Sequence, residues 1–181
     1  LSGTSPQGLG RSLKGKAFGS SCRHGKYLFV DIEDSDWLLM HFGMTGYLKY
    51  YKHNDDTPDY TQALFSFENG YHLAYVAPRK LGRIAVVASP EEFLRKQELG
   101  PDALAVTKNE FIEMASGYNG SIKSMLMNQK LIAGIGNIYS DEILFQARLH
   151  PKGAANKLDQ TSLKGLYRAM RSVLKSAIKA H

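Results

Sequence analysis

Residues 134–142 read Gly134-Ile135-Gly136-Asn137-Ile138-Tyr139-Ser140-Asp141-Glu142, so two glycines stand directly before an asparagine that we expect to cap a helix. Glycine allows tight turns with positive φ, and Asn is a favoured N-cap residue. A helix start presents N–H groups and a partial positive charge. The stretch therefore predicts a phosphate-binding helix N-terminus, and nucleic acid is the partner that we expect there.

The sequence around this turn predicts a helix, a double turn and a second helix. We expect helices over 121–129 and 137–148, and residues 130–136 between them are long enough for two successive turns. A dinucleotide-binding loop is the alternative reading of the glycines. That motif requires a third small residue, where this chain has Tyr139, and it follows a strand. We therefore reject it.

Upstream of Ala88 the pattern is β-rich. Aromatic and β-branched runs separated by turn residues predict strands over 26–32, 37–42, 46–51, 63–67, 71–76 and 83–87. Asn69-Gly70 lies between two of these runs and predicts a hairpin with a type I′ turn. Downstream, Ser89-Pro90-Glu91-Glu92 and Thr107 to Glu110 have the spacing of helix starts. The resulting fold class is α+β, with an antiparallel β-sandwich over 1–101 and an all-helical domain over 102–181.

The final segment predicts an amphipathic helix with a basic stripe beside its apolar face. The stripe is formed by Lys164, Arg168, Arg171, Lys175 and Lys179. It is suited to a phosphate backbone or an anionic membrane, and a solvated helix face is the ordinary alternative. A net charge of +6 and a pI near 9.3 also favour a polyanionic partner, without distinguishing DNA, RNA or membrane.

Cysteine content and hydropathy limit where the protein works. Cys22 is the only cysteine, which excludes an internal disulfide and a cysteine-rich zinc site. The sequence has no apolar run of about 20 residues and no signal-peptide pattern. We expect a soluble protein in a reducing cytoplasmic or nucleoid compartment, with no membrane partner.

Several separated segments together resemble the formamidopyrimidine-DNA glycosylase and endonuclease VIII (Fpg/Nei) family. The segments are Arg23 to Leu28, Met40 to Gly46, Pro78 to Gly82, Leu99 to Asp102, Ile122 to Met127, and Gly134 to Phe145 followed by His150-Pro151. Their combination and order are specific. The resemblance implies a β-sandwich followed by a helix-two-turn-helix (H2TH) domain, with double-stranded DNA held in the cleft between them. It also implies base-excision repair, in which an oxidised base is removed and the abasic strand is cut.

The family uses an N-terminal proline amine, which forms a Schiff base, and a neighbouring glutamate. This chain begins at Leu1 and has neither at its start, and it stops before the zinc or zincless finger that the family carries. We expect a fragment of a longer glycosylase and abasic-site lyase, truncated at the N-terminus of the sandwich and inactive by itself. We expect no cofactor in this chain.

The resemblance assigns site roles residue by residue. Lys26 matches a lysine that contacts the phosphate beside the lesion and assists strand cleavage, and Glu142 matches a carboxylate near the catalytic terminus. The other DNA-binding positions are His41, Met44, Arg79, Leu81, Lys123 and Asn137. Met44, Arg79 and Leu81 match the residues that fill the gap left by an everted base. Leu81 replaces a more usual Phe, Lys80 a second Arg, and Ala77 an acidic or amide residue, so the lesion specificity is not predicted.

Two other functions stay open. One is a damaged-DNA-binding protein that keeps the clamp and has lost the nucleophile. The other is an RNA-binding protein that uses the same double turn, a reading disfavoured because the motifs of the β-rich half match as well. No paired metal-ligand spacing, zinc-protease motif or nucleophile elbow is present in the sequence.

Overall fold

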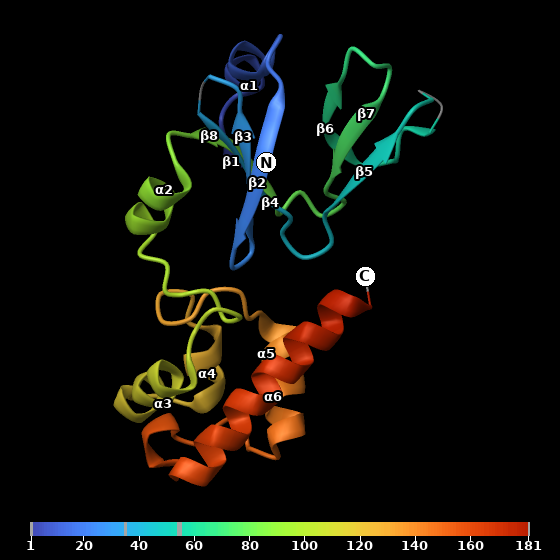
Figure 1. Cartoon of the computed structure of the whole chain (residues 1–181). Helices are drawn as coiled ribbons and strands as arrows, with labels where there is room; N and C mark the ends of the chain where they lie inside the picture. Colours follow the sequence, from blue (N-terminus) through green and yellow to red (C-terminus); the bar gives the residue numbers. More distant parts are fainter. Residues whose placement is uncertain (1, 35, 54–55, 181) are drawn as a thin grey trace. The chain divides into compact units, whose positions relative to one another are not determined.

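The computed structural model describes residues 2–34, 36–53 and 56–180, and it forms two compact units. The first contains the chain up to Arg23 and then Tyr27–Phe93. The second contains His24–Lys26 and the chain from Leu94 onward. Antiparallel sheets in the first unit and helices in the second confirm the predicted α+β class (Figure 1).

The larger sheet of the first unit has the strand order β1-β8-β4-β3-β2. Its strands are β1 (Ser2–Gly3), β2 (Phe18–His24), β3 (Tyr27–Ile32), β4 (Trp37–His41) and β8 (Arg83–Val87). The pairs β3–β4 and β4–β8 are antiparallel, whereas β1 runs parallel to β8. Strands β3, β4 and β8 carry buried side chains, whereas β2 at the edge is mostly exposed.

The smaller sheet consists of β5 (Tyr47–Tyr51), β7 (His72–Val76) and β6 (Thr61–Ser66), all antiparallel. The core of the unit joins buried Leu38 and Met40 of the larger sheet with Tyr75 of the smaller one. Leu48 and Phe65 pack against this core from the smaller sheet. The predicted sandwich is therefore confirmed.

The hairpin at Asn69-Gly70 forms, but its turn type differs from the prediction. A type I′ turn requires positive φ at both residues, and only Gly70 has it, with φ +79°. The Gly70 N–H donates to the Phe67 carbonyl at 3.0 Å, and the Phe67 N–H donates to the Tyr71 carbonyl at 2.9 Å. Three residues therefore form the loop, and the predicted two-residue turn is wrong.

Residues 2–24 contain more regular structure than the sequence predicts. A short strand, β1, precedes helix α1 (Pro6–Leu13), whose N-cap Ser5 accepts the Gly8 N–H. Strand β2, which contains Cys22, lies outside the predicted strand ranges. It lies at the edge of its sheet and is exposed along most of its length, so it has no alternating apolar pattern to reveal it.

Helix α2 (Pro90–Lys96) contains the boundary between the units, and its predicted start is confirmed by a 3.1 Å hydrogen bond from the Glu92 N–H to Ser89 Oγ. The second unit continues with α3 (Lys108–Gly117), α4 (Ile122–Met127), α5 (Asn137–Ala147), η2 (Ala155–Lys157) and α6 (Gln160–Lys179). The predicted capping box of Thr107 and Glu110 begins α3. The apolar face of α6 is buried with α3, α4 and α5, through Leu163, Leu166, Met170 and Val173.

The connection between α4 and α5 forms the double turn. Its shape depends on Gln129, whose Oε1 accepts the Gly134 N–H at 3.0 Å and whose Nε2 donates to the Ile135 carbonyl at 2.8 Å. The predicted cap of α5 is wrong. Gly136 is the N-cap and makes no side-chain hydrogen bond, because a glycine has none to make, and Asn137 is the first helical residue.

Candidate nucleic-acid interface

Two loops of the first unit carry three of its predicted DNA-binding side chains. The loop between β4 and β5 contains Met44, and the loop between β7 and β8 contains Arg79 and Leu81. Met44 is 68% exposed and Leu81 is 54% exposed, so both apolar side chains project into solvent. The Arg79 guanidinium donates to the Met44 sulfur at 3.2 Å. The structure thus places the three residues that we expect to fill the gap left by an everted base on adjacent loops.

Backbone geometry holds these loops together. Gly43 has φ +64°, and a Cβ on it would lie 2.8 Å from the Leu81 carbonyl carbon. Lys80 has φ +52° without being a glycine, a conformation that sets the directions of the residues on either side of it. The close approach of the loops therefore requires a glycine at 43.

His41 supports the same loops from the end of β4. Its Nδ1 accepts the Gly43 N–H at 3.1 Å, and its carbonyl accepts the Tyr75 hydroxyl at 2.6 Å. Burial raises the pKa of Tyr75, which keeps the phenol protonated as a donor. A Cβ on Gly82 would lie 1.8 Å from the Tyr75 hydroxyl oxygen, so that residue is also restricted to glycine. The half-buried His41 ring thus holds the turn before Met44.

Lys26 and the start of α5 come together in the second unit. A Cβ on Gly136 would lie 3.5 Å from the Lys26 ammonium nitrogen, so the cation stands beside the N-cap of the helix. The side chain is exposed overall, but desolvation lowers the pKa of Lys26. An ammonium beside the free N–H groups of a first helical turn is an arrangement that binds phosphate.

Asn137 is exposed in the first turn of α5, where its side chain is accessible to a ligand. Lys123 is on α4, and its ammonium pairs with Asp141 on α5 at 2.6 Å. Glu142 is exposed and accepts a hydrogen bond from Gln146 at 3.0 Å. The predicted residues of the second unit therefore gather around the N-terminal half of α5.

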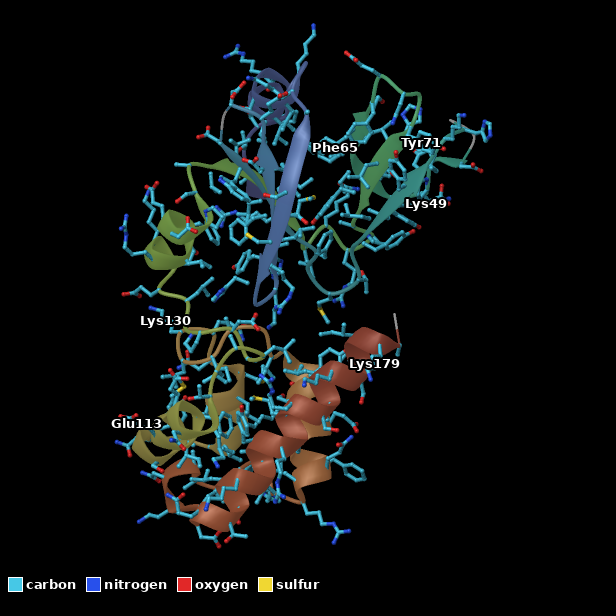
Figure 2. All side chains as sticks on the ribbon, viewed as in Figure 1. Lys49, Phe65, Tyr71, Glu113, Lys130 and Lys179 are labelled. Atoms are coloured by element: carbon cyan, nitrogen blue, oxygen red, sulfur yellow. The ribbon has the colours of Figure 1, made fainter. Side chains whose placement is uncertain are left out.

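The basic residues of α6 do not all remain available to a polyanion. Arg171 donates to the Leu104 carbonyl and so holds α6 to the segment before α3. Figure 2 shows Lys179 near the C-terminal end of α6 and Lys130 on the double turn. Lys130, which is outside the stripe, pairs with Glu98. The stripe is partly structural because Arg171 is bonded within the unit.

Sequence reasoning missed Asp102 and Gln129 as residues that shape this surface. Asp102 ends the segment from Leu99 that contributes to the family resemblance, yet the sequence gives no sign that its carboxylate accepts the Gly25 N–H at 2.8 Å.

No group of three or more potential metal-ligating side chains occurs among the described residues. Within the same residues, no helix combines the length and the apolar character needed to span a membrane.

Comparison with known proteins identifies the family of both parts of the chain. Residues 1–84 match the formamidopyrimidine-DNA glycosylase N-terminal domain, and residues 99–181 match the formamidopyrimidine-DNA glycosylase H2TH domain. The formamidopyrimidine-DNA glycosylase of Protochlamydia amoebophila is 33% identical over 97% of this chain and 63% of its own length. That of Moorella thermoacetica is 34% identical over 96% of this chain and 65% of its own length.

Solved structures agree with these relatives. The Lactococcus lactis Fpg protein in complex with DNA containing an abasic site has a TM-score of 0.87 and 29% identity, covering 96% of this chain and 65% of that one. The same protein in complex with FAPY-dG-containing DNA also has a TM-score of 0.87 and 29% identity, covering 96% of this chain and 66% of that one. The chain thus spans less than two thirds of the length of these proteins. Both of its domains match, and the chain belongs to the formamidopyrimidine-DNA glycosylase/endonuclease VIII family.

Proposed function

We propose that this chain is the DNA-binding core of a base-excision repair enzyme, a DNA glycosylase with abasic-site lyase activity that acts on oxidised bases. The observation that carries the proposal is the contact between Arg79 and Met44 on two exposed loops, with Leu81 exposed beside them. Membership of the family and the DNA complexes of the solved relatives support it.

In this function the first unit fills the DNA helix after a base has been turned out. Unstacking a base costs a few kcal/mol, and an inserted apolar side chain offsets part of that cost. Met44 is unbranched and flexible, so it adapts to the gap. Arg79 faces the orphaned base, and Leu81 separates the neighbouring pair. His41 and Tyr75 keep the loops in place through the hydrogen bonds given above.

The second unit grips the phosphates beside the lesion. The Lys26 ammonium and the first turn of α5 supply positive charge and N–H donors at one point, and the Asn137 amide adds a further donor. Lys123 contacts the backbone of the damaged strand after exchanging Asp141 for a phosphate. These contacts fix the position of the DNA without reading its sequence.

Base removal also requires an amine that attacks C1′ while the base departs. To the residues of this chain we assign binding, with Lys26 assisting strand cleavage and Glu142 close to the reacting sugar, and we do not assign the nucleophile. The second candidate function, a damage-sensing protein that binds without excision, is supported by the same loops and differs only in that amine.

Borohydride trapping on a duplex with one abasic site separates the two functions. This chain is compared with a version extended through its native upstream codons, and binding of both is measured in parallel. We expect both to bind and only the extended version to cross-link. If both bind and neither cross-links, the damage-sensing function replaces the enzyme; if neither binds, both functions fail.

A further inference from the structure

The turn that carries Lys26 belongs to the second unit, where it is held on two sides. Gly25 is buried with φ +56°, and its N–H donates to Asp102 Oδ2 at 2.8 Å. On its other side, a Cβ on Gly25 would lie 2.9 Å from the Ala133 Cβ and 3.1 Å from the Gly134 nitrogen. The turn therefore fits between Asp102 and the double turn only with glycine at this position.

Asp102 is a nearly buried carboxylate, only 9% exposed. Its second oxygen accepts the Leu104 N–H at 2.9 Å. The backbone around it is tied to the double turn, because the Ala133 N–H donates to the Pro101 carbonyl and the Ala103 N–H donates to the Ala133 carbonyl, each at 2.9 Å. A buried carboxylate is costly unless N–H groups satisfy it, so Asp102 selects a backbone arrangement that presents the Gly25 and Leu104 donors.

His24 adds a third restraint. Its Nε2 donates to the Gly100 carbonyl at 2.8 Å, and the Gly100 N–H donates to the Gln129 carbonyl at 3.0 Å. The segment before α3, the double turn and the turn of Lys26 therefore form one hydrogen-bonded assembly. The Lys26 ammonium emerges from it beside Gly136, at the start of α5.

We propose that Asp102 is a positioning residue for Lys26, fixing the turn at Gly25 so that the ammonium and the first turn of α5 bind the same DNA phosphate. This role rests on the proposed function. It gives a role to a nearly buried acid in a chain that we propose binds DNA. The desolvation that lowers the pKa of Lys26 is a property of this position and provides a direct readout of it.

Asp102→Asn tests the role, because an amide cannot accept both backbone N–H bonds. Asp159→Asn is the matched control, since Asp159 also accepts a backbone N–H, from Ser162 at 2.7 Å, and lies at the start of α6. Both variants remove one negative charge, which by itself strengthens DNA binding. We expect Asp102→Asn instead to weaken binding to an abasic duplex about tenfold, and we expect a similar loss in Lys26→Gln. We also expect the variant that combines Asp102→Asn with Lys26→Gln to bind no more weakly than either of these single variants, because both changes remove the same contact.

The titration of Lys26 by NMR is the deciding measurement, made after thermal unfolding has identified variants that remain folded. We expect the pKa of Lys26 to rise toward its ordinary value in Asp102→Asn and to stay unchanged in Asp159→Asn. Should Asp102→Asn unfold, Asp102→Ser provides the second variant with the same expectation, because its shorter, uncharged side chain cannot accept both backbone N–H groups. An unchanged Lys26 pKa in a folded Asp102→Asn or Asp102→Ser chain overturns the positioning role. If the unaltered chain does not bind the duplex, the proposed function is overturned. The Lys26 titration then still shows whether Asp102 positions the Lys26 side chain.

Discussion

The Arg79 guanidinium lies 3.2 Å from the Met44 sulfur and donates to it across 35 residues of sequence. The contact joins two loops that follow different strands of the same unit. It places a cation and an adaptable apolar group side by side on an exposed surface. That pairing is suited to an opening in stacked DNA, where one group meets an unpaired base and the other fills space.

Arg79→Ala should lower the preference for an abasic duplex over an intact duplex about tenfold, because the orphaned base loses its partner. Arg95→Ala is the control, since Arg95 is an exposed arginine on α2 and its removal changes the net charge equally. Equilibrium binding to both duplexes at one salt concentration measures the preference. An equal loss of preference in the two variants means that Arg79 contributes only charge.

Asp141→Asn should strengthen DNA binding severalfold, because Lys123 no longer has to leave its 2.6 Å ion pair to contact a phosphate. The gain should largely disappear at about 1 M salt, where screening shortens the reach of charges to about 3 Å. Glu113→Gln, which removes an exposed acid of α3 (labelled in Figure 2), corrects for net charge alone. If the two variants gain equally, Lys123 takes no part in binding.

Gly82→Ala should destabilise the first unit by about 1–3 kcal/mol, because the new Cβ would lie 1.8 Å from the Tyr75 hydroxyl and displace it from the His41 carbonyl. Unfolding followed by the fluorescence of Trp37, the single tryptophan, reports on this unit. Gly10→Ala is the control in α1, where a Cβ meets no atom within 4 Å. It should instead stabilise the unit by roughly 0.5–1 kcal/mol.

Acid should destabilise the helical unit in part through Asp159. The Ser162 N–H lowers the pKa of this carboxyl below its ordinary value of about 4. The stability that the bond contributes is therefore present above about pH 4 and is lost as the pH falls through the lower pKa of the folded state. Asp159→Asn should flatten this acid dependence and change stability little at pH 7, since Asn also caps helices. Urea unfolding of α-helical circular dichroism, measured across this pH range, tests the expectation, and an unaltered acid dependence contradicts it.

Local sequence patterns predicted the elements that have strong local causes. The capping box at Thr107 and Glu110 and the apolar face of α6 depend on spacings of three to four residues, and both occur as predicted. The range of strand β2 was not predicted because its side chains are mostly exposed at a sheet edge. The type I′ turn was wrong because the pairing of Phe67 with Tyr71 selects a three-residue loop.

The site could be predicted only in part, because some of its contacts join residues that are far apart in the sequence. Family resemblance indicated Met44, Arg79 and Leu81, and these lie together on exposed loops, although their roles on DNA stay predictions. The assignment of Asn137 as a cap failed because the preceding Gly136 takes that position. The bond between Asp102 and Gly25 joins residues 77 apart in sequence, and no local pattern encodes such a contact.

Binding of this chain to two duplexes of one sequence, with and without a single stable abasic site, tests the central claim most directly. The account predicts tighter binding to the abasic duplex by about tenfold or more, because the cost of unstacking a base is already removed there. It also predicts a similar salt dependence for both duplexes, since the phosphate contacts are shared. Equal affinity for the two duplexes would contradict the account and leave a protein that binds polyanions without recognising damage.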